Sequence, residues 1–247
     1  MYEPCSQLLP PLLFVAVAGD LVGLGCIGAA RWQLWLSDRV DMARRRCTYC
    51  KEGEGTTSDH IPPRSFFGNP PPHNLITVLC CETCRVRDQQ DDQLVRNLFV
   101  SFRDTESHPT VVSQVAGRRD RSFTYDITQA GKLIELVVPV EARGPDGLLV
   151  HIAPAFRLND SRVDRFIERA SRGVIYDAFG VAYFGASFWW EPQGHGFLLP
   201  SATIKWKEKH VGDVFSYWVR SEDAEQVFWV IMRFYRNFLI LGRLEKA

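Results

Sequence analysis

Apolar and polar positions alternate with helical periodicity in three parts of the chain. Residues 91–102 carry apolar side chains at spacings of one, three and four and open with acidic residues, which favours an amphipathic helix. A short helix is expected at 109–117. The clearest pattern is an apolar stripe over 161–178, which begins with Ser161 and Asp164 at the spacing of a capping box. Each of these helices is expected to pack one face on a core.

Runs rich in aromatic and β-branched residues predict strands in the second half of the chain. Turns that contain glycine separate several of these runs. We expect strands at 123–128, 132–141, 147–158, 214–219 and 226–241. Together with the helix at 161–178, these strands predict one mixed α+β domain over residues 121–247.

Residues 44–92 show little periodicity and are rich in glycine and proline. Such a segment buries little apolar surface, so a metal staple is expected to supply part of its folding free energy. We therefore place a separate module at 42–105.

Residues 1–41 allow several interpretations. The apolar stretch 12–30 approaches the length of a membrane span, but Asp20 at its middle opposes insertion and a basic n-region of a signal peptide is absent. Gly23 to Gly28 matches a dinucleotide-binding fingerprint without the second strand that such a fold needs. We favour a leader outside the fold or a gene start placed too early, because Met42 directly precedes the cysteine motif. Membrane contact is not expected.

Composition narrows the classes of function. The chain has 247 residues, is 46% hydrophobic and carries 29 basic against 29 acidic residues, which predicts a folded protein and excludes a polybasic one. Five of the seven cysteines lie between positions 47 and 84, a clustering typical of metal binding in a cytoplasmic protein and not of disulfides.

Two CxxC pairs, Cys47 with Cys50 and Cys81 with Cys84, have the spacing of zinc knuckles. Four thiolates complete a tetrahedral shell, so a structural Zn²⁺ is expected. A redox CxxC is the alternative, but it needs one pair beside a βαβ unit. Cys80 and Cys81 compete for one ligand position, and only Cys81 keeps the CxxC spacing.

Between the two pairs lie the segments Asp59-His60-Ile61-Pro62-Pro63 and Asn74-Leu75-Ile76-Thr77-Val78. With the paired knuckles, their order resembles the HNH, or ββα-metal, endonuclease superfamily. The acidic pair Asp91-Asp92 and the segments 161–180, 211–219 and 227–238 are similar to an uncharacterised bacterial group of HNH proteins, so the resemblance covers 44–247. It implies a treble-clef-like ββα-metal module followed by an α+β domain, and hydrolysis of phosphodiester bonds in nucleic acid, with DNA as the expected substrate.

The resemblance also implies roles for single residues. His60 is the expected general base, because an imidazole titrates near neutral pH. Asp59 is expected to hold a catalytic Mg²⁺ or Mn²⁺, an ion that prefers carboxylate oxygens. Asn74 is expected to hold the loop that carries the base.

One position departs from the HNH pattern. The family usually has a metal-binding Asn or His after the last knuckle cysteine, and here Arg85 stands there, a cation that cannot bind metal. Asp88, one helical turn further, is our candidate for the missing ligand. Arg85 is then free to hold phosphate, together with Arg64 and Arg46. The alternative is a catalytically silent zinc-knuckle module that binds nucleic acid or protein.

Overall fold

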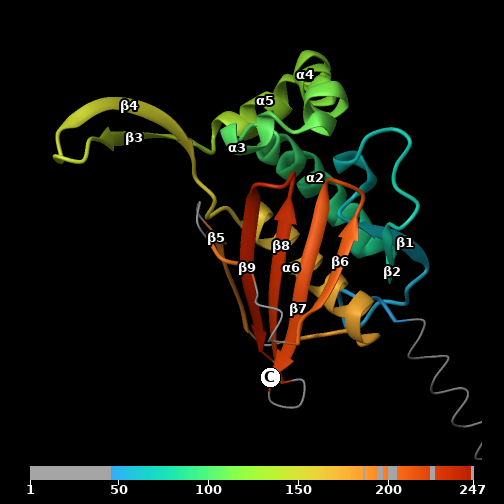
Figure 1. Ribbon diagram of the computed structural model, residues 1–247. Coiled ribbons are helices and arrows are strands. Elements are labelled where there is room, and N and C mark those ends of the chain that lie inside the picture. Colours follow the sequence, from blue (N-terminus) through green and yellow to red (C-terminus); the bar gives the residue numbers. More distant parts are fainter. Residues whose placement is uncertain (1–45, 186, 194–196, 200–204, 223–225, 246–247) are drawn as a thin grey trace, which may run out of the picture. The chain divides into compact units, whose positions relative to one another are not determined.

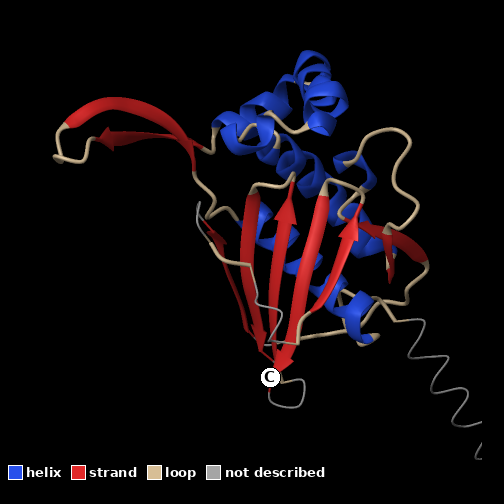
Figure 2. Ribbon diagram, viewed as in Figure 1, coloured by secondary structure: helices blue, strands red, loops and turns tan. Residues whose placement is uncertain are grey.

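The computed structural model describes residues 46–247 except 186, 194–196, 200–204, 223–225 and 246–247. A five-stranded antiparallel sheet with the order β5-β9-β8-β7-β6 forms the largest element of this part (Figure 1). Its strands are β5 (Ser187–Gln193), β6 (Lys207–Val211), β7 (Phe215–Glu222), β8 (Val227–Phe234) and β9 (Phe238–Glu245). The strand predicted at 214–219 is thereby confirmed. Helices and strands together make a mixed α+β fold (Figure 2).

Helix α6 (Ser161–Phe179) lies across one face of this sheet and contacts β7 and β8. Its start is capped by Asp160, whose side chain accepts a hydrogen bond from the Arg162 amide at 2.8 Å. Its end is set by Gly180, which adopts a left-handed conformation at φ 71°. The apolar stripe read from the sequence is buried, so the helix predicted at 161–178 is confirmed.

A smaller layer packs on α6. The strands β1 (Thr57–Ile61) and β2 (Ile76–Cys80) form an antiparallel hairpin, and α2 (Glu82–Phe99) follows it directly. The helix predicted at 91–102 is therefore the second half of a longer helix. Gly173 of α6 permits the close approach of the hairpin, because a Cβ atom there would lie 1.7 Å from Cδ1 of Ile61.

Four further helices and turns join α2 to the next strands, and they correct one prediction. They are α3 (Arg103–Glu106), the π-helical turn η2 (Val111–Val115), α4 (Ala116–Tyr125) and α5 (Ile127–Ile134). Residues 123–128, predicted as a strand, belong to α4 and α5. The side chain of Asp126 accepts from the Thr128 amide at 3.0 Å and starts α5, and this local cap outweighs the β propensity of the run.

The next strands form a two-stranded arm. β3 (Val137–Arg143) pairs only with β4 (Leu149–Phe156) among the described strands, and Figure 1 shows the pair projecting from the remaining elements. The strand predicted at 147–158 is confirmed. The strand predicted at 132–141 begins only at Val137, because α5 continues to Ile134.

The run at 226–241, predicted as one strand, is a hairpin of β8 and β9. Tyr235 and Arg236 turn the chain with positive φ angles of 47° and 68° and without a glycine. The buried Tyr235 hydroxyl donates to the carbonyl oxygen of Phe66 in the 3₁₀ turn η1 (Arg64–Phe66) at 2.9 Å. A contact between distant segments thus holds the turn.

Aromatic side chains from both halves of the chain share one core. Phe66 stacks on Phe166 of α6 with ring centroids 5.4 Å apart, and Phe99 of α2 meets Phe234 of β8 at 5.0 Å. The two parts of the chain that were expected to fold separately, 42–105 and 121–247, therefore pack against each other. No helix of the described residues is long and apolar enough to cross a membrane. The interpretations of residues 1–41 fall outside the described residues.

Candidate functional site

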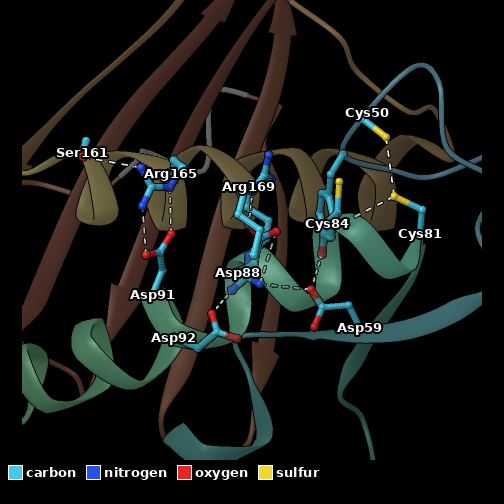
Figure 3. A network of polar contacts seen from close by, with 12 residues as sticks. Cys50, Asp59, Cys81, Cys84, Asp88, Asp91, Asp92, Ser161, Arg165 and Arg169 are labelled. Atoms are coloured by element: carbon cyan, nitrogen blue, oxygen red, sulfur yellow. Dashed lines mark hydrogen bonds and ion pairs between the residues drawn. The ribbon is translucent and has the colours of Figure 1, made fainter. Parts of the chain in front are cut away.

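The four knuckle cysteines converge at the start of α2. All four Sγ atoms lie within 4.8 Å of one another, and those of Cys50 and Cys81 are 3.7 Å apart. Zn–S bonds of about 2.3 Å in a tetrahedron place sulfur atoms about 3.8 Å apart. The cluster can hold a metal ion, and Zn²⁺ fits its size and its ligands. Figure 3 shows three of these cysteines.

Backbone amides support the sulfur atoms in both knuckles. The Tyr49 amide donates to Cys47 Sγ at 3.4 Å, and the Cys84 amide donates to Cys81 Sγ at 3.5 Å. Cys81 is also the N-cap of α2, so the helix start and the ligand position are one feature. These donors stabilise thiolates.

The thiols differ in acidity. Burial raises the pKa of Cys47 and of Cys84. Burial also opposes ionisation of Cys50, but hydrogen bonds from the Gly53 backbone and the neighbouring thiols outweigh it and lower its pKa. Two resistant thiols must therefore lose protons when a metal binds, so metal affinity is expected to fall on acidification.

A substitution at Gly53 tests whether the four cysteines bind zinc. A Cβ atom at this position would lie 2.6 Å from both Cβ and Sγ of Cys81, so Gly53→Ala is expected to displace a ligand and lower zinc affinity at least about tenfold. Competition with a chromophoric chelator measures this affinity. Gly131→Ala is the matched control, because nothing lies within 4 Å of the added atom. Equal zinc affinity in both variants would contradict the assignment.

Cys80 lies outside the tetrad. It is buried, and its Sγ is 3.2 Å from Thr57 Oγ1, whose hydroxyl also donates to the Cys80 carbonyl at 2.9 Å. Of the two competing cysteines, Cys81 is the one in the cluster.

Asp59 and His60 lie on opposite faces of β1. The strand is regular, with Asp59 opposite Val78 and His60 opposite Thr77 on β2, and successive side chains of a strand alternate. Asp59 accepts a hydrogen bond from the Tyr49 hydroxyl at 2.7 Å on the side of α2 and α6.

His60 has a different environment. Its Nδ1 lies 3.1 Å from Thr77 Oγ1, and the imidazole is half-buried. Partial burial and the positive charge of Arg64 lower the pKa of His60 below its ordinary value. The ring is therefore neutral near pH 7 and can accept a proton.

Arg169 of α6 stands at the centre of the acidic residues between β1 and α2 (Figure 3). Its guanidinium forms ion pairs with three carboxylates, those of Asp59 at 3.5 Å, Asp88 at 3.7 Å and Asp92. Only 7% of the Arg169 side chain is exposed. Burial opposes its charge, but the surrounding carboxylates outweigh burial and raise its pKa above the ordinary value.

These carboxylates do not fit a catalytic divalent ion in this arrangement. Arg169 forms an ion pair with each of them, and Asp88 also accepts a hydrogen bond from Arg87 Nε at 2.7 Å. Among the residues that the structure describes, the cysteine tetrad is the one group of potential ligands close enough to share a metal. Asp59 and Asp88 thus converge as the sequence suggested, but on an arginine.

The other predicted residues lie apart. The Asn74 amide donates to the His210 carbonyl of β6 at 2.7 Å, so it ties the hairpin to the large sheet. Arg85 is exposed and pairs with Glu82 of the same helix at 2.5 Å. Arg64 and Arg46 are also exposed.

Sequence reasoning missed Arg169 and its neighbour Arg165, whose Nε and Nη2 bind both oxygens of the buried Asp91 at 2.8 and 3.0 Å. The four-residue spacing of these arginines along the predicted helix was the available signal. The sequence analysis placed Asp91 and Asp92 at the start of a helix. They lie instead in the middle of α2, where each forms an ion pair with an arginine of α6.

Comparisons with known proteins do not assign the chain to a family. No family model matches the chain, and neither the curated proteins nor the solved structures contain a significant match.

Proposed function

We propose that this protein is an HNH-type endonuclease that hydrolyses phosphodiester bonds in nucleic acid, with His60 as general base. The observation that carries the proposal is the environment of His60. His60 Nδ1 lies 3.1 Å from Thr77 Oγ1, and in the tautomer whose Nδ1–H donates to this hydroxyl, Nε2 is the acceptor that would take a proton from water.

Three further features support this proposal. The knuckle, hairpin and helix follow one another in the order expected for a treble-clef-like ββα-metal module, and the four cysteines could hold its structural Zn²⁺. Arg64 is exposed, and its positive charge helps to lower the pKa of His60, so the same charge would attract a phosphate toward this part of the surface. Because Arg169 holds the carboxylates, no catalytic step is assigned to a divalent ion.

His60→Ala is expected to reduce nicking of supercoiled DNA by about 10²- to 10⁴-fold, because the proton acceptor is removed. Plasmid relaxation with and without Mg²⁺ or Mn²⁺ measures the rate, and zinc content should stay unchanged. His73→Ala, at an exposed histidine between β1 and β2, is the matched control. Cleavage at the wild-type rate by the His60 variant would eliminate His60 as the base.

The pH profile provides a separate check. Since the pKa of His60 is lowered, activity should fall only when the pH drops below the ordinary histidine range of about 6.5. Arg64→Gln removes a charge that lowers this pKa, so the acid limb should move to higher pH. If the acid limb of the pH profile did not move, the charge of Arg64 would not influence the pKa of the catalytic base.

A second function, binding of nucleic acid without cleavage, is favoured by the ion pairs of Arg169. They occupy the carboxylates that the HNH pattern assigns to metal, and Arg85 replaces a metal ligand. This alternative predicts oligonucleotide binding with no nicking under any divalent ion. The plasmid assay on the wild-type protein separates the two functions.

A further inference from the structure

A pocket of about 180 Å³ lies at one end of the large sheet, beside two hairpin turns. One turn joins β6 to β7 and the other joins β8 to β9, and the strand ends that flank them pair in one row. The polar residues of the lining are His210, Asp213, Ser216, Arg233 and Arg236. Neither His60 nor a knuckle cysteine belongs to this lining.

Arg233 of β8 presents an oriented guanidinium to the pocket. It lies directly opposite Ser216 of β7, and its Nε donates to the Ser216 hydroxyl oxygen at 3.1 Å. The guanidinium carbon lies 5.0 Å from the centre of the Trp218 ring, a cation–π contact. The ring is held in turn by a hydrogen bond from Trp218 Nε1 to Glu208 at 2.6 Å. The two Nη groups of Arg233 have no hydrogen-bond partner among the described residues, so a fixed fork is available to a ligand.

Arg236 adds a second cation. Its side chain is exposed and forms no ion pair or hydrogen bond within the described part of the chain. Burial lowers the pKa of the half-buried Arg233, and the positive charge of Arg236 lowers it further. Two like charges therefore act on each other at this site, and the described residues supply neither with a carboxylate partner.

The backbone at Arg236 supports a role in binding. Its φ of 68° lies in the left-handed region, where glycine or asparagine is the ordinary residue of a hairpin turn. Strained backbone of this kind is concentrated at functional sites, including sites that clamp ligands. The turn thus carries an arginine where a smaller residue would fit the backbone better.

One carboxylate, that of Asp213, also lines the pocket. The Thr110 hydroxyl lies 3.3 and 3.2 Å from its two oxygens, and His108 Nε2 lies 3.7 Å from one of them. Among the ion pairs of the described residues, none joins Asp213 to Arg233 or Arg236. The lining therefore carries two guanidinium charges against one carboxylate and keeps a net positive charge.

We propose that this pocket binds a phosphate group through Arg233 and Arg236. Guanidinium forks match the oxygens of phosphate, and two neighbouring cations favour a multiply charged oxyanion. The volume lies below the roughly 300 Å³ at which pockets for whole organic ligands begin, so one phosphate fits and a complete nucleotide does not. The proposal stands whether or not His60 catalyses hydrolysis.

The source of the phosphate is either a nucleic-acid strand or a small phosphate compound. Sodium phosphate is compared with sodium chloride at equal ionic strength, and the thermal midpoint of the full-length, zinc-loaded protein is followed. Phosphate is expected to raise the midpoint, and a phosphate titration gives the affinity. A fluorescent single-stranded oligodeoxynucleotide is then titrated by anisotropy, with and without phosphate as competitor.

Two variants separate binding from stability. Arg236→Asn removes the charge and suits the left-handed turn, so phosphate affinity should fall about tenfold while the thermal midpoint without phosphate stays the same or rises. Arg233→Lys keeps the charge but loses the fork, so phosphate affinity should fall severalfold. Arg121→Gln, at an exposed arginine of α4 outside the pocket, is the matched control and should leave phosphate affinity unchanged.

Each outcome decides the proposal. If oligonucleotide affinity falls together with the phosphate affinity of both variants, the ligand is a strand phosphate. If only phosphate binding falls, the ligand is a small phosphate compound. The proposal is overturned if phosphate stabilises the protein no more than chloride does, or if Arg236→Asn binds phosphate as tightly as the wild type. Neither result depends on nicking, so failure here is distinct from failure of the proposed nuclease.

Discussion

Cys84→Ser is expected to abolish stoichiometric zinc binding and to unfold most of the described part of the chain. Structural zinc contributes on the order of 10 kcal/mol to small metal modules, which is comparable to the roughly 5–15 kcal/mol stability of a typical domain. The loss of structure should not stay local, because Phe66 and Phe99, from the half of the chain that carries the cysteine tetrad, pack against Phe166 and Phe234.

Zinc content by mass spectrometry and thermal unfolding by circular dichroism measure the effect. Cys80→Ala is the matched control, because Cys80 adjoins Cys81 and is buried but lies outside the tetrad. It should retain one zinc ion per chain. If Cys84→Ser retained zinc and Cys80→Ala lost it, Cys80 and not Cys84 would be the metal ligand.

Arg169→Met is expected to destabilise the protein by about 3–5 kcal/mol, because it leaves buried carboxylates without their cation. Asp88 has only 4% of its side chain exposed, and Asp59 and Asp92 have 16% each. Urea unfolding measures the loss. Arg85→Met removes the same charge from an exposed pair and should cost far less stability.

The loss should depend on pH. Burial raises the pKa of Asp92 to about 7 even though Arg169 lowers it, so removing Arg169 raises this pKa further. A carboxyl whose pKa is higher in the folded state stabilises that state at low pH, and this contribution is lost as the pH rises through the folded value. The destabilisation should therefore be smaller at pH 5 than at pH 8, and Asp92→Asn should recover part of it. A loss that is equal at both pH values would contradict the buried ion-pair network.

Local spacing was sufficient to predict much of the fold. The two CxxC pairs each lie within one tight turn, so their convergence on a metal site followed from the sequence. Helix α6 was equally predictable, because its apolar stripe and its terminal Gly180 lie within 161–180. Its N-cap, however, is Asp160 and not Ser161 of the predicted capping box. The prediction of a strand at 123–128 was wrong, because the side chain of Asp126 caps the start of a helix within a run of residues that favour strands.

The candidate site was less predictable, because its partners are distant in the chain. The sequence by itself determined which four cysteines can hold a metal. It also placed Asp59 and His60 between the two knuckles and Asp88 after them. Only the tertiary structure decided that Arg169 reaches these acids, because α6 must first cross the hairpin at Gly173. A knuckle is encoded within four residues, whereas the pairing of buried charges depends on which elements the shared core brings together.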